Sequence, residues 1–138
     1  MKEVKQIKMD IDKENLLIIL SDYFSEKLGR NVNVDCNVTI KHISYGYDDC
    51  EAVPDIVFFI KEVISNGKVT ATTTTYLDQN DLEEAIKDYV SSSDYEFESF
   101  KYKGGVRLAG YFRDEYEEAY FEGLDVKLKE KAMQRRLR

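Results

Sequence analysis

The sequence predicts an α+β fold in which two similar strand–helix–strand–strand units form a single domain over residues 1–138, with antiparallel sheets packed by helices and a C-terminal helix. Three observations support this prediction. Apolar residues recur at helical spacing in two separate stretches and alternate with polar residues in several others. Turn residues divide the alternating stretches. The pattern of the first half also returns in the second half at a constant offset.

The first unit begins with an expected strand over residues 3–9 and a helix over residues 13–28. Asp12 precedes the helix as a candidate N-cap, whose side chain can accept a hydrogen bond from a free backbone N–H. Gly29 follows the helix, at the position where many helices end in a left-handed conformation. The helix therefore has a boundary signal at each end.

Two strands complete the first unit. Apolar residues alternate over residues 32–40, as in a strand with one buried face, and a second strand is expected over residues 56–63. Asn66-Gly67 is a strong hairpin signal. The threonine-rich stretch 68–76 then favours the first strand of the second unit, because β-branched residues fit extended backbone.

The second unit is expected to repeat this order. A helix over residues 79–91 has Asp78 or Asn80 as its cap. A strand then begins at Tyr95, Gly104-Gly105 offers a hairpin turn, and a further strand covers residues 106–112.

The C-terminal segment has two interpretations. Apolar residues recur there every four positions, which indicates a helix, and the glutamate and lysine residues between them favour a helix too. Leu124, Val126 and Leu128 also alternate, which indicates a strand, and Gly123 weakens the helix. We predict a helix. Its expected face consists of Tyr116, Tyr120, Leu124, Leu128 and Ala132.

A constant offset along the chain relates the two halves. It places Ile11-Asp12 on Leu77-Asp78 and Leu16 on Leu82. The same offset holds over three separate stretches, so we predict an internal duplication that spans approximately residues 3–66 and 69–132. The alternative is that any two amphipathic α+β halves resemble each other.

One difference between the two helices points to a contact surface. Leu17 and Ile18 stand where the second helix carries glutamates, so the first helix is apolar on all sides between residues 16 and 20. A helix of this kind must be covered on more than one side. The C-terminal segment could cover it, or Leu17 and Ile18 could form a homodimer interface.

The charge of the chain is negative and unevenly distributed. The net charge is −7, but the Lys127–Arg138 tail carries +5 and the remainder therefore −12. An acidic body repels nucleic acid and attracts basic protein surfaces, so direct nucleic-acid binding is expected only as a weak contact through the tail. The sequence contains no apolar run that could span a membrane and no signal peptide, which predicts no membrane contact and a cytoplasmic location.

The residues that catalysis needs are scarce. His42 is the single histidine, and no phosphate-binding loop, nucleophile elbow or metal-ligand spacing occurs. Cys36 and Cys50 are expected to be free thiols. We therefore expect no catalytic residues, no metal and no cofactor, and a protein that is not an enzyme.

Two acidic clusters that also contain tyrosines are the candidate binding site. Aromatic side chains supply binding energy at protein interfaces, and carboxylates supply charge complementarity. The candidate residues are Tyr45, Tyr47, Asp48, Asp49 and Glu51 in the first cluster, and Asp114, Glu115, Tyr116, Glu117 and Glu118 in the second.

These features predict a non-enzymatic protein that binds a partner with a basic surface, such as a nucleic-acid-binding enzyme. In size, charge and lack of an active site, the chain is similar in style to phage and mobile-element anti-defence inhibitors, including anti-CRISPR proteins and anti-restriction DNA mimics, although no motif carries that resemblance. The alternatives are an oligomeric structural or assembly protein, and a small-ligand-binding protein with a pocket between the two units.

Overall fold

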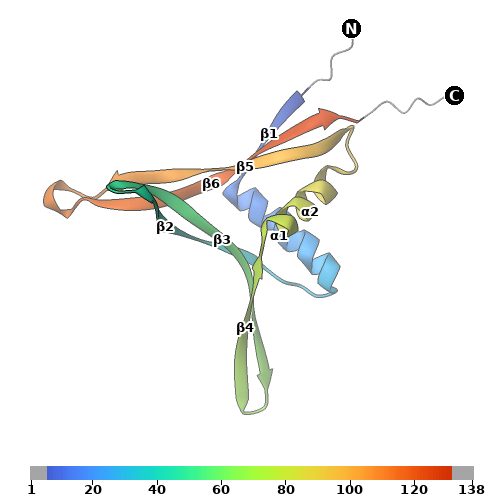
Figure 1. Cartoon of the computed structure of the whole chain (residues 1–138). Helices are drawn as coiled ribbons and strands as arrows, with labels where there is room; N and C mark the ends of the chain where they lie inside the picture. The colour runs from blue at the N-terminus through green and yellow to red at the C-terminus, as the bar shows by residue number, and fades with distance from the viewer. Residues whose placement is uncertain (1–5, 132–138) are drawn as a thin grey trace, which may run out of the picture.

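The computed structural model describes residues 6–131, and within this range six strands, two α-helices and one 3-10 turn follow one another (Figure 1). The elements are β1 (Gln6–Asp12), α1 (Lys13–Leu28), β2 (Val34–Gly46), β3 (Asp49–Asn66), β4 (Val69–Leu77), α2 (Gln79–Val90), β5 (Tyr95–Ala109), η1 (Phe112–Asp114) and β6 (Tyr116–Glu130).

The strands form two antiparallel sheets, in the orders β1-β6-β5 and β2-β3-β4. The helices α1 and α2 contact each other and pack against the sheets near the centre of the molecule (Figure 1). The α+β class and the antiparallel sheets packed by helices are therefore confirmed.

A single hydrophobic core joins both helices to both sheets. Leu16 and Leu20 on α1 and Ile86 on α2 are completely shielded from solvent. They meet Phe58 of one sheet and Leu124 of the other. The central parts of β3 and β6 therefore carry the apolar alternation that the helices cover, and the ends of these strands extend beyond the core.

Both helices begin at the aspartates expected from the sequence. The Asp12 side chain accepts a hydrogen bond from the Asn15 backbone N–H at 2.8 Å. Asp78 accepts one from the Asp81 N–H at 2.9 Å, and the Asp81 side chain accepts a bond from the Asp78 N–H in return, which makes a capping box. Gly29 has a left-handed φ of 71° after α1, as its place in the sequence predicts.

The two halves have the same order of strands and α-helices and share a strand register near the core. Ile11 pairs with Leu124 in one sheet, and the residues that the sequence offset assigns to them, Leu77 and Phe58, pair in the other. Cys36 also pairs with Phe58 in one sheet. The residues at the corresponding positions of the other sheet, Tyr102 and Leu124, pair in the same way. The first strand of each half therefore lies in the sheet formed by the hairpin of the other half.

The C-terminal helix predicted for residues 116–132 is wrong over its described part, because residues 116–130 form the strand β6. The alternation of Leu124, Val126 and Leu128, all buried, outweighs the helix propensity of the charged residues between them. Gly123 is decisive, because it lies against β1 with φ 140°, where a Cβ would overlap the Ile11 carbonyl oxygen. The Ala132 end of the prediction lies outside the described residues.

The hairpin turn predicted at Gly104-Gly105 is also wrong. Both glycines lie inside β5, at a shift of register between Lys103 and Gly104. A Cβ at Gly104 would overlap the Tyr120 backbone oxygen of β6, and one at Gly105 would lie 3.0 Å from the Tyr120 hydroxyl. These glycines permit a β-bulge and a close strand contact, and the chain reverses later, between Ala109 and Tyr116.

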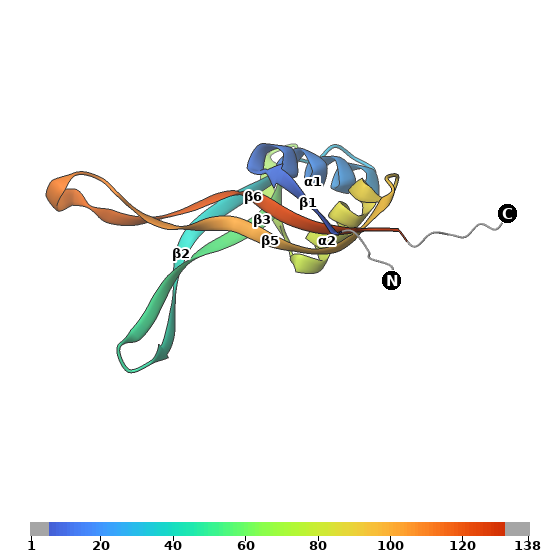
Figure 2. The same cartoon turned by 90° about the horizontal axis from the view of Figure 1, so that it is seen from above.

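Three two-stranded arms extend from the core in different directions (Figures 1 and 2). They are the β2–β3 arm, the β3–β4 arm and the β5–β6 arm, each ending in a turn. The strands are longer than the sequence suggested. β3 includes Pro54, which is tolerated because β4 pairs only with residues 58–66, so that β3 has a free edge at Pro54.

The helices and the C-terminal tail bear on the predictions about membranes and nucleic acid. No helix within residues 6–131 is long and apolar enough to cross a membrane. Of the Lys127–Arg138 tail, residues 127–130 belong to β6, and residues 132–138 lie outside the described part of the chain.

Candidate partner-binding site

The first acidic cluster lies at the tip of the β2–β3 arm. Tyr47 is 98% exposed, and Asp48 beside it has a φ of 60°, a left-handed value that aspartate tolerates better than most residues. Tyr45 donates a hydrogen bond from its hydroxyl to Glu51 at 3.1 Å, which raises the pKa of Tyr45. Asp49 is also exposed, so the tip presents aromatic rings and carboxylates together.

The second cluster lies at the tip of the β5–β6 arm and contains two aromatic residues absent from the predicted site. Tyr111 and Phe112 are 79% and 90% exposed, and their rings stack at 6.3 Å. Phe112 lies on the surface and not in the core. The signal that could have identified it is Gly110, which has a φ of 96° and marks the turn.

The acidic residues of this second tip are not equivalent. Asp114 and Glu115 belong to the turn and are exposed, as is Tyr116 at the start of β6. Glu118 is half-buried and pairs with Arg107 at 3.2 Å, and the Arg107 guanidinium lies 4.7 Å from the Tyr120 ring centroid. Glu118 is therefore part of the structure of the arm and is less available to a partner than Asp114 and Glu115.

The β2–β3 and β5–β6 arms contact each other through side chains on their strands. His42 of β2 lies 3.8 Å from Glu117 of β6, and both side chains are about half exposed. The ends of the two arms lie apart (Figure 2). The structure therefore places the two predicted clusters on neighbouring projections and not on one flat face.

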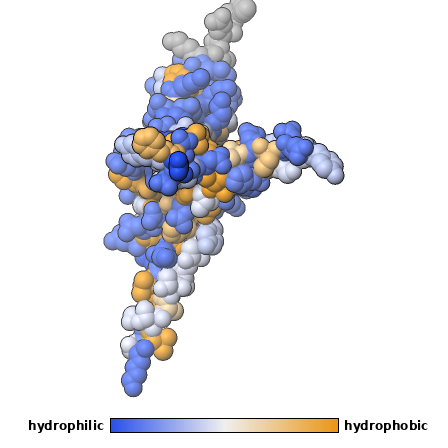
Figure 3. Space-filling view, turned by 90° about the vertical axis from the view of Figure 1, so that its left-hand side faces the viewer, coloured by the Kyte–Doolittle hydropathy of each residue, from blue (hydrophilic) through white to orange (hydrophobic). Residues whose placement is uncertain are grey.

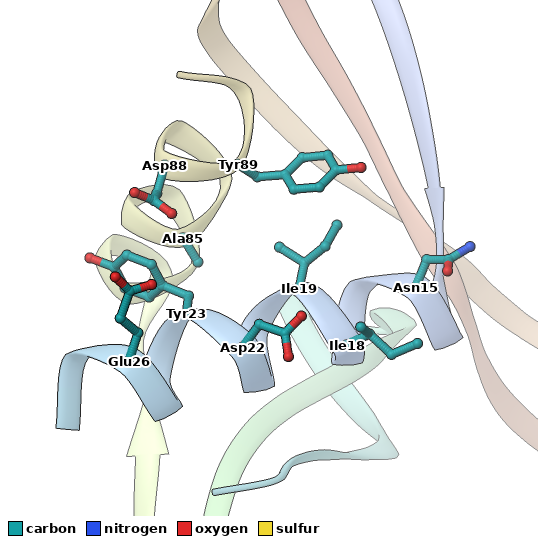
Figure 4. Close-up of a pocket in the computed structure, with 9 residues that line it drawn as sticks. All are labelled: Asn15, Ile18, Ile19, Asp22, Tyr23, Glu26, Ala85, Asp88 and Tyr89. Atoms are coloured by element: carbon teal, nitrogen blue, oxygen red, sulfur yellow. The ribbon is translucent and has the colours of Figure 1, made fainter. Parts of the chain in front are cut away.

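A groove of about 280 Å³ lies between α1 and α2, which belong to different halves of the chain (Figure 4). Ile18 is 57% exposed at its edge, whereas Leu17 is half-buried against the core. Of the two residues predicted as a dimer interface, only Ile18 is thus largely available. The groove is lined by Asn15, Ile18, Ile19, Asp22, Tyr23, Glu26, Ala85, Asp88 and Tyr89.

Within residues 6–131, candidate metal ligands are dispersed and one of the two thiols is half-buried. No group of three His, Cys, Asp or Glu side chains in that range is arranged to hold a metal ion. Cys36 and Cys50 are both free thiols, and burial raises the pKa of Cys36 to about 11. A thiol with such a pKa is a poor nucleophile at neutral pH.

Comparison with protein-family models, with curated proteins and with solved structures finds no match to this chain. The geometry of the arms and of their tips therefore carries the functional argument.

Proposed function

We propose that this protein is a non-enzymatic protein-binding protein that docks the tips of its β2–β3 and β5–β6 arms on a basic surface of its partner. The observation that carries the proposal is the exposure of three aromatic side chains, Tyr47, Tyr111 and Phe112, at the far ends of arms that extend away from the core. Large aromatic residues are the usual anchors of protein interfaces.

The backbone at the β5–β6 tip supports this role. Phe112 combines 90% exposure with a φ of 50°, so the free protein gains no burial from the ring and holds it in an unfavourable backbone conformation. Burial in a pocket of a partner would recover the apolar contribution, which is roughly 1.5–3 kcal/mol for a phenylalanine side chain. At the other tip the left-handed φ belongs to Asp48, and the exposed Tyr47 beside it has no such strain.

The charges around the anchors favour a basic partner. Asp48 and Asp49 follow Tyr47, and Arg113, Asp114 and Glu115 follow Phe112, so each tip keeps an excess of negative charge. With a net charge of −7, the whole molecule adds to the attraction at long range. Complementary charge accelerates association and excludes partners of the same sign.

We further propose that the partner is a nucleic-acid-binding enzyme and that docking inhibits it, as anti-CRISPR and anti-restriction proteins inhibit theirs. Such enzymes carry basic clefts that bind phosphate groups. Arms that end in carboxylates could occupy a cleft of this kind from two directions.

We also propose that the two tips descend from one duplicated unit. The order β-α-β-β occurs twice. The offset that relates Ile11 to Leu77 also relates their partners, because Ile11 of β1 pairs with Leu124 of β6 and Leu77 of β4 pairs with Phe58 of β3. The β2–β3 and β5–β6 arms are then equivalent hairpins, so each half contributes one tip to the binding site.

The test begins with capture on the immobilised protein from a lysate of cells that carry the gene, followed by affinity measurements with the purified partner. We expect binding to weaken steeply between about 50 mM and 300 mM salt, since screening weakens exposed charges. Asp49→Lys with Glu115→Lys should lower the affinity by about tenfold or more. Asp48 is left unchanged because its φ of 60° would add backbone strain to the charge effect.

The matched control carries the same change of charge away from the tips, as Asp55→Lys with Glu122→Lys, both exposed on strands. It should keep most of the affinity. Equal losses in the two variants, or binding that ignores salt, would refute docking by the tips. A DNA oligonucleotide that binds the captured partner equally well in the presence of saturating protein would refute the inhibitory form of the proposal alone.

A further inference from the structure

The outer edge of β4 differs from the other sheet edges of the molecule. In sheet order the outer strands are β1 and β5 in one sheet and β2 and β4 in the other. The central strands β3 and β6 also have free edges along the arms, where they contain charged residues and, in β3, Pro54. Such edges present unpaired N–H and C=O groups, and proteins usually protect them with charged residues, prolines or bulges. β1, β2 and β5 contain charged side chains, and β2 and β5 also contain shifts of register.

β4 has none of these protections. Its sequence, Val-Thr-Ala-Thr-Thr-Thr-Thr-Tyr-Leu, contains no charged residue, no proline and no glycine, and its pairing with β3 runs from Asn66 to Phe58 without a bulge. A third of the residues in the whole chain are charged, so a neutral stretch of nine is unusual here. Eight of the nine residues are exposed.

The β3–β4 arm is also unsupported beyond the core. Two-stranded ribbons are marginally stable in water unless more strands or a hydrophobic face support them. Val63, Ile64 and Val69 on this arm are 67%, 54% and 66% exposed. The arm that points downward in Figure 3 is accordingly pale or orange over most of its length and blue at its end.

We infer that β4 is a pairing edge for a second copy of this chain, and that two arms join through antiparallel β4 strands into one continuous six-stranded sheet. A two-fold axis then lies between the two strands. Thr–Thr cross-strand pairs, which are favourable, occur near that axis. The four-stranded ribbon that results supplies the support that each arm lacks alone.

The distribution of charge permits two copies to associate through β4 and opposes their association through the acidic tips. With a net charge of −7, two copies repel each other, and contacts through either acidic tip would bring carboxylates together. The neutral β4 strand brings no charged side chains face to face, and the length of the arm keeps the two acidic bodies apart. Pairing covers the β4 edge of each copy, and the other edge of the arm, β3 beyond Ile60, carries Lys61 and Glu62, so growth stops at two copies. This inference is independent of the function proposed for the acidic tips.

The test is the oligomeric state of the full chain, measured by analytical ultracentrifugation from about 1 µM to 1 mM. We expect a reversible dimer. Thr70→Lys with Thr72→Lys should weaken dimerisation by about tenfold or more, since lysines on an edge strand oppose pairing and each copy brings two. Asn37→Lys with Thr39→Lys, the matched change on the other edge of the same sheet, should leave the dimer intact.

Hydrogen exchange identifies the surface that pairs. On dimerisation, alternate amides of Val69–Leu77 should gain protection, because every second residue of an edge strand directs its N–H outward. A monomer over the whole concentration range would overturn the inference, as would open-ended aggregation. A dimer without this protection would also overturn the inference. So would a dimer that Ile18→Asp disrupts and the β4 lysines leave unaffected, because either result would assign the contact to another surface.

Discussion

Arg30 and Glu62 form a bidentate ion pair, with distances of 2.7 Å from Nε to Oε2 and 2.8 Å from Nη2 to Oε1. Arg30 lies just after α1, and Glu62 lies on β3 where the β3–β4 arm leaves the core. The pair therefore ties the base of the arm to the end of a helix from the same half of the chain. A planar guanidinium facing both carboxylate oxygens fixes the direction in which the arm leaves.

The first prediction concerns the pH dependence of this ion pair. The hydrogen bond from Arg30 lowers the pKa of Glu62 below its ordinary value of 4.5. A carboxyl whose pKa is lower in the folded state stabilises the fold above its ordinary pKa and loses that contribution as the pH falls through the lowered value. The difference in free energy of unfolding between the wild type and Glu62→Gln should therefore shrink as the pH falls below about 4.5.

Denaturation by urea at several pH values checks this expectation. Arg30→Lys is the control, since an ammonium group cannot form two parallel hydrogen bonds with a carboxylate. It should reduce the pH-dependent contribution without removing the positive charge. A difference between the wild type and Glu62→Gln that is the same at pH 7 and pH 3 would show that the ion pair contributes nothing to folding.

The second prediction concerns the contact between Gly123 and β1. A Cβ at Gly123 would overlap the Ile11 carbonyl oxygen and lie 2.8 Å from the Asp12 Cα, and the φ of 140° is itself unfavourable for other residues. Gly123→Ala should cost about 2–4 kcal/mol of free energy of unfolding. Gly29→Ala is the matched control, because Gly29 has a φ of 71° but no atom within 4 Å of an added Cβ. It should cost only about 1 kcal/mol.

The third prediction compares equivalent core positions of the two halves. Leu20 and Ile86 are matched by the sequence offset and are both completely buried. Substitution of either by alanine should cost about 2–5 kcal/mol. The same change at Ile18, which is 57% exposed, should cost much less. Urea denaturation of the three variants measures these losses. A loss at one buried position and not at the other would contradict an equivalent role for the two halves.

The elements that the sequence predicted well are those whose signals are local. Asp12 and Asp78 identified the starts of both helices, because an N-cap acts within the first turn of the helix that follows it. Asn66-Gly67 identified the β3–β4 hairpin for the same reason. The internal duplication stays a prediction, although the offset behind it relates the pair Ile11 and Leu124 to the pair Leu77 and Phe58.

The failures share a physical cause, which is contact between distant segments. Gly123 was interpreted as a weak point in a helix, whereas its role is to let β1 approach. Gly104 was interpreted as a turn, whereas it avoids the backbone of Tyr120. The length of the arms cannot be predicted from the sequence either, because a strand that continues beyond the core has the same alternation of residues as a strand within it. For the same reason the sequence does not reveal that Phe112 is exposed.

The fourth prediction separates the two cysteines. Burial raises the pKa of Cys36 to about 11, so that its thiolate fraction at pH 8 is about one thousandth. Cys50 is exposed at the start of β3. A maleimide reagent should modify one thiol rapidly and the other far more slowly, and Cys50→Ser should abolish the fast phase. In concentrated urea the two rates should converge. Equal rates in the native protein would show that Cys36 is not protected.

The fifth prediction separates binding from stability at the β5–β6 tip. Phe112 has a φ of 50°, and glycine adopts this conformation without the strain caused by a Cβ. The ring is 90% exposed, so its removal takes away little packing. Phe112→Gly should therefore leave the free energy of unfolding unchanged or raise it by up to about 1 kcal/mol. The same change should sharply weaken binding to the partner captured by the wild type.

Phe112→Ala completes the comparison, because alanine lacks the ring but keeps the Cβ. It should weaken binding as much as glycine does, and the alanine variant should be less stable than the glycine variant. This pattern would indicate that the strain at Phe112 is retained for presentation of its ring to a partner. If both variants instead bind as the wild type does, the aromatic tip is not the anchor. If Phe112→Gly unfolds the protein, the ring supports the fold in a way that its exposure conceals.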